Sequence, residues 1–222
     1  MREPKNRGQK TRCPKCGTQY YDLGRKRTPC PSCHRASLIE AGTVAEVSLR
    51  IKRGGHNDPD QGWTDGCATA NKNGAAWLDC EFELTAGELA GKKFRSLIGL
   101  HTPKGAWWGN EGRRTIRNIL NSAHSLLNED YSQEAITARR LKSLAELDGL
   151  TFVAEIGVGK GKDGLETNEL SAALTPDDER FSSKKRTSVT DGVSSGLGDM
   201  TGKNPPKLSE DTAFTPVWMS KV

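Results

Sequence analysis

Two short cysteine motifs near the start of the chain, Cys13-Pro14-Lys15-Cys16-Gly17 and Cys30-Pro31-Ser32-Cys33-His34, decide how its N-terminal part folds. Each motif places two thiols on one tight turn, so that both sulfurs can face a common point. Gly17 can adopt the positive φ that closes the first turn. Thirteen residues separate Cys16 from Cys30. Four thiolates at this spacing are typical of a tetrahedral zinc site.

The sequence therefore predicts a zinc ribbon over residues 13–36 that holds one structural Zn²⁺. Four thiolates leave no coordination position open for a substrate, so the site is expected to be structural rather than catalytic. Two disulfides are the alternative, and they fit poorly in a chain whose first residues lack a secretory signal. Thiols arranged for a metal indicate a reducing compartment, so we expect a cytoplasmic location. The predicted ligands are Cys13, Cys16, Cys30 and Cys33.

Basic residues are concentrated at the N-terminal end. Residues 1–40 contain ten Lys and Arg against three Asp and Glu, whereas residues 41–175 contain 16 against 18 and residues 176–222 are neutral. A basic N-terminal segment predicts a polyanionic partner, most simply nucleic acid. A solvated arm is the alternative, and residues 1–12 are expected to form a flexible basic arm.

The middle of the chain, residues 42–175, has the pattern of a domain that is mainly β with a helical insert. Apolar and polar residues alternate in five segments, and this period of two predicts strands. Helical periodicity predicts two helices between the third strand and the fourth, over about residues 112–127 and 133–147. The predicted strands are residues 45–52, 77–84, 93–100, 152–158 and 170–174.

This order of three strands, a helical insert and two strands is typical of an OB-fold-like barrel. A small α+β sheet covered by a helix pair is the rival fold. A Gly- and Pro-rich loop is expected from Gly54 to Gly66, and a mobile basic hairpin loop from Gly159 to Gly164. The absence of eighteen consecutive apolar residues excludes a membrane-spanning helix, so no membrane partner is expected.

From residue 176 onward the chain is rich in Ser, Thr, Gly, Lys and Asp, and we expect a disordered tail. The last residues reverse this trend and form an apolar tip. Two roles remain open for the tip, namely docking on the barrel or binding a replication or recombination protein. The predicted partner-binding residues are Phe214, Val217, Trp218 and Met219.

Basic residues and aromatic residues together suggest how a single strand would be held, because bases stack on aromatic rings. Trp63, Trp107 and Trp108 are expected in loops near arginines, with packing against the helices as the alternative. Tyr20 and Tyr21 are expected to pack over the metal, with base stacking as the alternative for one of them. The predicted nucleic-acid-binding residues are Arg25, Lys26, Arg27, Lys52, Arg53, Trp63, Lys92, Lys93, Arg95, Lys104, Trp107, Trp108, Arg113, Arg114, Arg117, Lys160 and Lys162.

Acidic residues on the second predicted strand oppose phosphate binding there. Asp79, Glu81 and Glu83 would repel a nucleic-acid backbone, and we expect them to pair across strands with basic residues such as Lys93 and Arg95.

The sequence contains no catalytic motif, and the four histidines occur in different predicted elements. His56 with Asp58 and Asp60 could suggest a metal loop, but a polar surface loop is the simpler interpretation. A protein without enzymatic activity is therefore expected.

The N-terminal motifs resemble a known family. Arg12-Cys13-Pro14-Lys15-Cys16-Gly17-Thr18, Tyr20-Tyr21-Asp22-Leu23-Gly24 and Pro29-Cys30-Pro31-Ser32-Cys33 are similar to the short zinc-ribbon "FYDL" proteins of alphaproteobacteria. The sequence departs from that pattern at Tyr20, where Phe is usual, and at His34, where Gly is usual. This resemblance implies a bacterial source and no particular activity.

The middle of the chain resembles phage-encoded replication and recombination proteins of the single-stranded-DNA-binding type. The matching segments are Gly74-Ala75-Ala76-Trp77-Leu78, Phe82-Glu83-Leu84, Gly91-Lys92-Lys93-Phe94, Arg114-Thr115-Ile116-Arg117-Asn118-Ile119-Leu120 and Leu147-Asp148-Gly149-Leu150-Thr151-Phe152-Val153, with Asn168 before the last strand. The small acidic tip that usually ends such proteins is not plainly present.

We therefore expect a non-enzymatic protein that binds single-stranded nucleic acid, in particular DNA, in the replication or recombination of a phage or prophage. Its expected location is the cytoplasm of the bacterial host. The alternative is a zinc-ribbon adaptor that binds replication, transcription or host proteins. Such an adaptor would have little affinity for nucleic acid.

Overall fold

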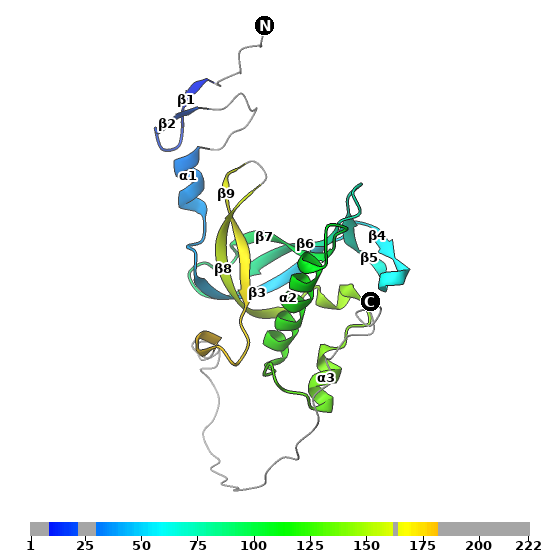
Figure 1. Cartoon of the computed structure of the whole chain (residues 1–222). Coiled ribbons are helices and arrows are strands. Elements are labelled where there is room, and N and C mark those ends of the chain that lie inside the picture. The colour runs from blue at the N-terminus through cyan, green and yellow to red at the C-terminus, as the bar shows by residue number, and fades with distance from the viewer. Residues whose placement is uncertain (1–8, 22–29, 162–163, 182–222) are drawn as a thin grey trace, which may run out of the picture. The chain divides into compact units, whose positions relative to one another are not determined.

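The computed structural model describes residues 9–21, 30–161 and 164–181 (Figure 1). The chain divides into two compact units, each of which is described by itself. The described part of residues 1–43 belongs to the first unit together with residues 156–169. The second unit contains residues 44–155 and the described residues from 170 onward. The predicted tail from residue 182, including its apolar tip, lies outside the described residues.

The first unit begins with the small antiparallel pair β1 (Lys10–Arg12) and β2 (Gln19–Tyr21), followed by helix α1 (Pro31–Ser37). Lys10–Arg12, which we expected in a flexible arm, form a strand because they pair with Gln19–Tyr21 across the turn that holds the first cysteine motif. The hairpin end of β8 (Thr151–Lys160) and β9 (Glu166–Ala173) completes this unit.

The larger sheet has β6 at its centre. One edge of β6 pairs with β7, and the other edge is shared by β5 at its start and β3 further along. The strand order is β4-β5-β6-β3-β8-β9, with β7 on the free side of β6, and the sheet is curved (Figure 1). Its remaining strands are β3 (Thr43–Lys52), β4 (His56–Asp58), β5 (Trp63–Ala70), β6 (Ala76–Leu84) and β7 (Lys93–His101).

The five predicted strands correspond to β3, β6, β7, β8 and β9, and helices follow the third of them as expected. The class is therefore mainly β with a helical insert. Within the described ranges, no pairing joins β7 to β9, so the sheet does not close into a barrel.

The prediction of a loop from Gly54 to Gly66 is wrong. This stretch contains β4, the 3₁₀ helix η1 (Pro59–Gln61) and the start of β5. Gly62 takes a left-handed conformation, with φ 77°, and lets the chain reverse after η1. The glycines and the single proline of the stretch, Pro59, therefore shape a short, irregular hairpin rather than prevent strand formation.

Helix α2 (Trp107–His124) starts five residues earlier than the predicted helix at 112. Gly109 and Gly112 have low helix propensity, so the sequence pattern indicated a loop where the first turns of α2 lie. They are required because a Cβ on Gly109 would lie 2.7 Å from the carbonyl oxygen of Leu100, and one on Gly112 would overlap that of Gly99. The glycines thus allow α2 to pack closely on β7.

The second predicted helix, 133–147, is divided into α3 (Gln133–Arg139) and the 3₁₀ helix η2 (Leu144–Leu147). Ser132 begins α3 by accepting a hydrogen bond from the amide of Ala135. The apolar residues of this region are still buried. Leu144 and Leu147 of η2 belong to the core, and so does Leu141, which lies between α3 and η2.

A buried arginine holds the segment between α2 and α3. Arg139 is 1% exposed, and its guanidinium donates to Oδ1 of Asn121 at 2.6 Å, to the carbonyl oxygen of Leu127 at 2.7 Å and to that of Asp130. Burial lowers the pKa of Arg139 from its usual value. Among the described residues, oriented dipoles rather than a direct ion pair therefore compensate this charge.

Aromatic and aliphatic side chains fill the core beneath α2. Phe82 stacks on Phe94 with ring centroids 5.1 Å apart and meets the ring of Phe152 edge-on at 6.1 Å. Ile116 and Ile119 present the buried face of α2 to this core. Among the described residues, no helix has both the length and the apolar character needed to span a membrane.

Candidate metal centre and nucleic-acid interface

The first cysteine motif lies in the turn between β1 and β2. The amide of Gly17 donates to the carbonyl oxygen of Cys13, and the amide of Cys13 donates to that of Thr18, both at 2.9 Å. Gly17 has φ 75°, as its place in the turn predicted. The second motif begins α1, where Cys30 is the residue before the helix and Cys33 lies one turn further on.

The four sulfurs form one cluster, with all their Sγ atoms within 4.8 Å of one another. The Sγ atoms of Cys13 and Cys33 are 3.7 Å apart, and those of Cys16 and Cys30 are 3.5 Å apart. A disulfide requires about 2.05 Å, whereas zinc–sulfur bonds of about 2.3 Å in a tetrahedron place sulfurs about 3.8 Å apart. These cysteines are free thiols, and their spacing is compatible with one metal ion.

The acid–base properties of the cluster also favour a cation. Contacts with Thr18 lower the pKa of Cys16 to about 6, whereas the hydrogen bond with Cys16 and burial raise the pKa of Cys33 to about 12. One thiolate in the cluster thus disfavours a second when no positive charge is present. A bound metal ion removes this conflict by stabilising all four thiolates, and it would leave no open coordination position.

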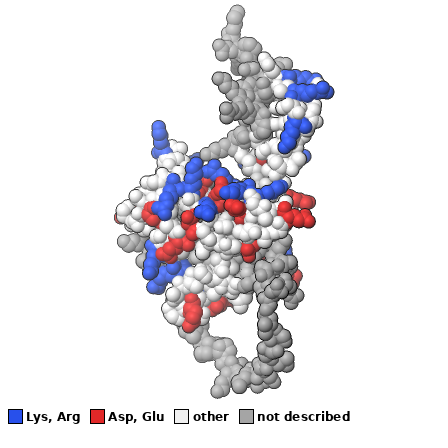
Figure 2. Space-filling view, turned by 180° about the vertical axis from the view of Figure 1, so that it is seen from behind, with Lys and Arg blue, Asp and Glu red and all other residues white. Residues whose placement is uncertain are grey.

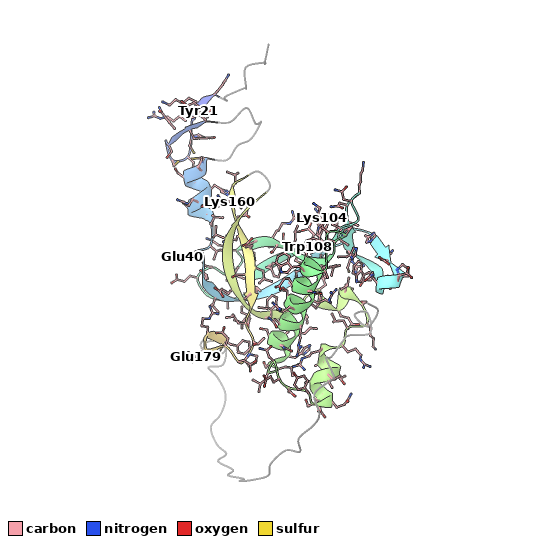
Figure 3. All side chains as sticks on the ribbon, viewed as in Figure 1. Tyr21, Glu40, Lys104, Trp108, Lys160 and Glu179 are labelled. Atoms are coloured by element: carbon pink, nitrogen blue, oxygen red, sulfur yellow. The ribbon has the colours of Figure 1, made fainter. Side chains whose placement is uncertain are left out.

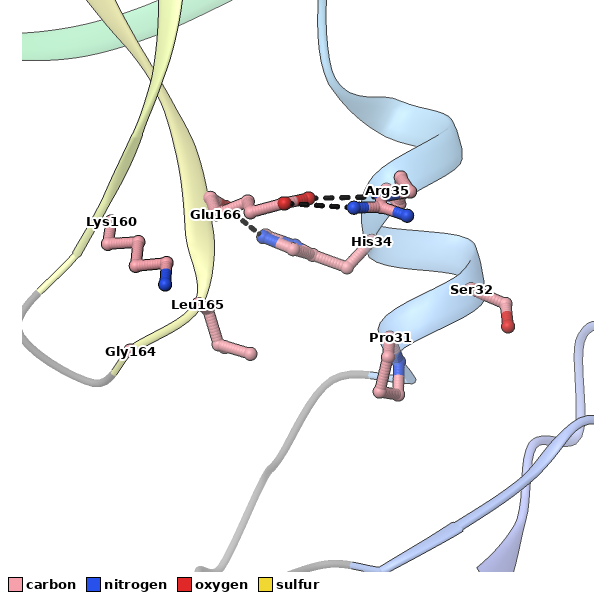
Figure 4. Close-up of a pocket in the computed structure, with 8 residues that line it drawn as sticks. All are labelled: Pro31, Ser32, His34, Arg35, Lys160, Gly164, Leu165 and Glu166. Carbon is pink, nitrogen blue, oxygen red and sulfur yellow. Dashed lines mark hydrogen bonds and ion pairs between the residues drawn. The ribbon is translucent and has the colours of Figure 1, made fainter.

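The end of the β8–β9 hairpin holds α1 through residues that directly follow the second cysteine motif. The guanidinium of Arg35 donates to both carboxylate oxygens of Glu166, at 3.0 and 2.9 Å, and Nε2 of His34 donates to the carbonyl oxygen of Glu166 at 2.6 Å (Figure 4). Arg35 lowers the pKa of Glu166. Lys160 lines the same small pocket. Sequence analysis missed these contacts because they join positions 131 and 132 residues apart.

Tyr20 and Tyr21 of the first unit lie on β2. Tyr21 is 58% exposed, so the expectation that both rings pack over the metal site is wrong for this residue. Tyr20 is partly buried. The difference follows from the alternation of side chains along β2, which places neighbouring residues on opposite faces.

Trp63 does not lie in an exposed loop as expected. It is the first residue of β5 and is 3% exposed, with its ring 6.5 Å from that of His56. A ring buried in this way offers no face on which a base could stack. The metal loop that His56, Asp58 and Asp60 could have suggested is not found in the described part of the chain, where Asp58 caps η1 by accepting from the amide of Gln61.

The two remaining candidates, Trp107 and Trp108, occupy the first turn of α2 and have different environments. Trp108 is partly buried, with its ring 6.5 Å from that of Trp77, and it fills the space over Gly99 where a Cβ would clash with it. Trp107 is 73% exposed, the highest exposure among the large hydrophobic residues described. Figure 3 shows Trp108 and Lys104 at the end of α2 where the helix begins.

Two of the predicted basic contacts on the sheet are paired with carboxylates. Nζ of Lys93 lies 3.1 Å from both Glu81 and Glu83, and Arg95 donates to Asp79 at 2.7 Å. This confirms the expected cross-strand pairing. Basic and acidic side chains are accordingly mixed on the face seen in Figure 2.

Only some of the basic side chains of α2 have a carboxylate partner among the described residues. Arg114 forms an ion pair with Glu111 at 2.8 Å, and Arg117 donates to the carbonyl oxygen of Asn128. Arg113 bonds only the neutral amide of Asn110 in the described part of the chain.

Several other predicted contacts are exposed, and none of them forms an ion pair within the residues described. Arg53 donates to the carbonyl oxygen of Asp65 at 3.1 Å. The others are Lys52, Lys92, Lys104 and Lys160. Eight predicted site residues lie outside the described residues, namely Arg25, Lys26, Arg27, Lys162, Phe214, Val217, Trp218 and Met219.

The structure also brings together residues that sequence analysis did not select. A cleft of about 570 Å³ lies between the end of β7, η1 and the first turns of α2. Ala106, Gly109, Asn110 and Arg113 recur at helical spacing and form one wall, and this spacing would have revealed the wall if the helix start had been placed correctly. We call this the α2 cleft; its other lining residues are Gln61, Leu100, His101, Thr102 and Gly105.

Comparison with known proteins identifies one related family model. It is described as "Protein of unknown function (FYDLN_acid)" and matches residues 1–66, which include all four clustered cysteines. This supports a zinc-ribbon-like N-terminal part. No curated protein and no solved structure matches the chain. The resemblance of the middle domain to phage proteins receives no support from these comparisons.

Proposed function

We propose that this chain is a non-enzymatic protein that binds single-stranded nucleic acid, with DNA as the expected strand. The observation that carries the proposal is the exposed ring of Trp107, with basic residues before and after it in the chain that have no carboxylate partner among the described residues. Arg113 follows Trp107 by six residues along α2, and Lys104 precedes the helix by three residues. An exposed aromatic ring next to free cations is the combination that holds a strand by base stacking and phosphate contacts.

The arrangement of strands is consistent with this proposal. The pairings β7-β6-β3-β8-β9, with the helices inserted between β7 and β8, agree with an OB-fold that has not closed. OB-folds are partly open five-stranded barrels that commonly bind oligonucleotides. We therefore keep the OB-like assignment as part of the proposal.

Zinc is the metal that we propose for the cysteine cluster. Four soft thiolate ligands in a tetrahedron favour Zn²⁺ over hard cations such as Mg²⁺, which prefer oxygen. In this role the ion stabilises the N-terminal fold and performs no chemistry on a substrate. Metal analysis of the purified chain should find one equivalent of zinc, and a different metal or none would refute this assignment.

The test of the function is a fluorescence-anisotropy titration of labelled single-stranded DNA, duplex DNA and single-stranded RNA at low and moderate salt. We expect preferential, salt-sensitive binding to single-stranded DNA. Trp107→Ala should weaken binding by about 1–3 kcal/mol, the usual value of one lost stack. Tyr131→Ala is the matched control, because this ring is 59% exposed but follows the other end of α2.

Two results would contradict the proposal. Absence of binding to every probe at low salt would favour the alternative of a protein–protein adaptor. Equal weakening by Trp107→Ala and Tyr131→Ala would show that stacking at the start of α2 is not the specific interaction.

A further inference from the structure

The α2 cleft has the dimensions and chemistry of a ligand site. Its volume of about 570 Å³ lies within the range of sites that hold small molecules, about 300–1,000 Å³. Apolar atoms of Leu100 and Ala106 form part of the surface, and polar side chains from three elements surround them. Gln61 comes from η1, His101 from the end of β7, and Asn110 from α2.

The charge of the cleft favours an anion. Arg113 is a cation, and none of the described side chains that line the cleft is acidic. Its guanidinium carries five N–H groups, and the described residues use one bond, to Oδ1 of Asn110, without an ion pair. The neighbouring Arg114 is different, because its charge is already compensated by Glu111. A phosphate can therefore bind Arg113 without displacing a carboxylate.

Gly105 makes the backbone of the cleft accessible. It is exposed, has φ 139° and lines the cleft without a side chain, whereas the buried Gly109 faces the carbonyl oxygen of Leu100. Together with the hydroxyl of Thr102 and the amides of Gln61 and Asn110, the cleft presents both donors and acceptors. A sugar or base requires such mixed partners, whereas inorganic phosphate alone would not use them.

Trp107 does not line this cleft, but it directly follows Ala106, which does. Trp107 and Asn110 are three residues apart in the same helix, so their side chains are neighbours on its surface. A nucleotide in the cleft would place the next base of the strand within reach of the exposed ring of Trp107.

From these observations we infer that the α2 cleft binds one nucleotide of a single strand, with its phosphate on Arg113, while an adjacent base stacks on Trp107. The inference rests on the proposed function and specifies which residues perform it. It adds Gln61, His101 and Asn110 to the interface.

The experiment compares the full-length protein with Arg113→Gln and with the control Lys142→Gln. Gln keeps a polar, although shorter, side chain and removes the charge, and Lys142 is an exposed cation of the same unit without an ion pair among the described residues. Each protein is titrated with a labelled oligo(dT) of about 20 nucleotides, longer than a typical OB-fold site. Thermal melting confirms that each variant is folded.

We expect Arg113→Gln to weaken binding at least about 5-fold and to reduce the slope of log affinity against log salt by about 0.7, the value for one phosphate of a single strand. Lys142→Gln should change neither quantity by a comparable amount. An oligonucleotide carrying photoreactive 5-iodouracil should crosslink to the peptide that contains residues 100–113. Free thymidine monophosphate and inorganic phosphate, added as competitors, distinguish a nucleotide of a strand from an isolated anion.

The possible failures are distinct. If the unmodified protein does not bind oligo(dT), the proposed function fails and the cleft assignment fails with it. If it binds and Trp107→Ala weakens binding, but Arg113→Gln is unchanged and crosslinks map elsewhere, only the cleft assignment is overturned. Competition by inorganic phosphate as strong as that by the nucleotide would also overturn it.

Discussion

The side chain of Asn168 binds both backbone groups of Ile39. Its Oδ1 accepts from the amide of Ile39 at 2.8 Å, and its Nδ2 donates to the carbonyl oxygen of Ile39 at 2.8 Å. Nδ2 also lies 3.2 Å from the carbonyl oxygen of Gly157 on β8. One amide thus joins the segment after α1 to both strands of the β8–β9 hairpin.

Asn168→Ala should destabilise the protein by about 1–3 kcal/mol, because the amide and carbonyl of buried Ile39 lose their partners. Chemical denaturation measures the change. Asn73→Ala is the control. Asn73 is exposed in a turn, and its side chain forms no hydrogen bond with the described residues. Similar effects of the two substitutions would show that the paired hydrogen bonds contribute little.

Removal of the metal should expose the four clustered thiols but not the two core thiols. After treatment with a strong chelator, we expect Cys16 to react first with iodoacetamide, since contacts with Thr18 lower its pKa to about 6. Cys67 and Cys80 should stay unreactive because they are buried. Mass spectrometry of the alkylated peptides gives the order of reaction, and early labelling of Cys80 would contradict the structure.

Alkaline pH should destabilise the protein through Cys80. Burial raises the pKa of this thiol to about 12, whereas an unfolded cysteine ionises near its ordinary value of 9.0. The folded state therefore retains a proton that the unfolded state loses, so this stabilisation is complete below about pH 9 and declines between about pH 9 and 12. Denaturation at about pH 8 and 10 should show a smaller loss in Cys80→Ala than in the unmodified protein. Equal losses in both proteins would exclude this contribution.

Arg139→Met should cost several times more stability than Arg140→Met. The first substitution leaves Asn121 and the carbonyl groups of Leu127 and Asp130 without their donor. We expect it to lower the free energy of unfolding by about 3–5 kcal/mol. Arg140 is the adjacent residue and is exposed, so its substitution should cost less than about 0.5 kcal/mol. Thermal melting of the two variants checks the difference, and comparable melting temperatures would refute it.

Gly112→Ala should destabilise the packing of α2 on β7 by about 1–3 kcal/mol or more, because the new methyl group would overlap the carbonyl oxygen of Gly99. Arg114→Ala on the exposed side of the same helix should be nearly neutral. A stabilised Gly112→Ala variant would mean that α2 can move away from β7 at little cost.

The cysteine cluster could be predicted from sequence because the spacing of the four cysteines determines how they can meet. The main strands could be predicted for a similar reason, since alternation along β3 or β6 reports directly on one buried face. Both features depend on residues close together in the chain. The β4–β5 hairpin escaped prediction because glycines flank β4 and one interrupts β5, and because its register is irregular between His56 and Asp58.

The candidate interface was less predictable because exposure depends on distant partners. Sequence alone gave Trp63 and Trp107 the same role, yet one is buried and the other exposed. The strand that begins at Trp63 has such a distant partner, because the carboxylate of Asp65 accepts from the amide of Ala145 at 2.8 Å and so holds η2 against β5. No local pattern reports a bond between positions 80 residues apart.

The central place of β6 has a consequence for the order in which the fold can form. Its pairing with β7 closes a short turn, from Leu84 to Lys93, whereas its pairing with β3 must close the longer segment from Lys52 to Asp79. Shorter loops close at lower entropic cost, so the β6–β7 hairpin is the natural nucleus. β3 then joins an edge that already exists, and β8 can add only after β3 is in place. A nascent chain would therefore assemble this sheet from the middle of its sequence outward in both directions.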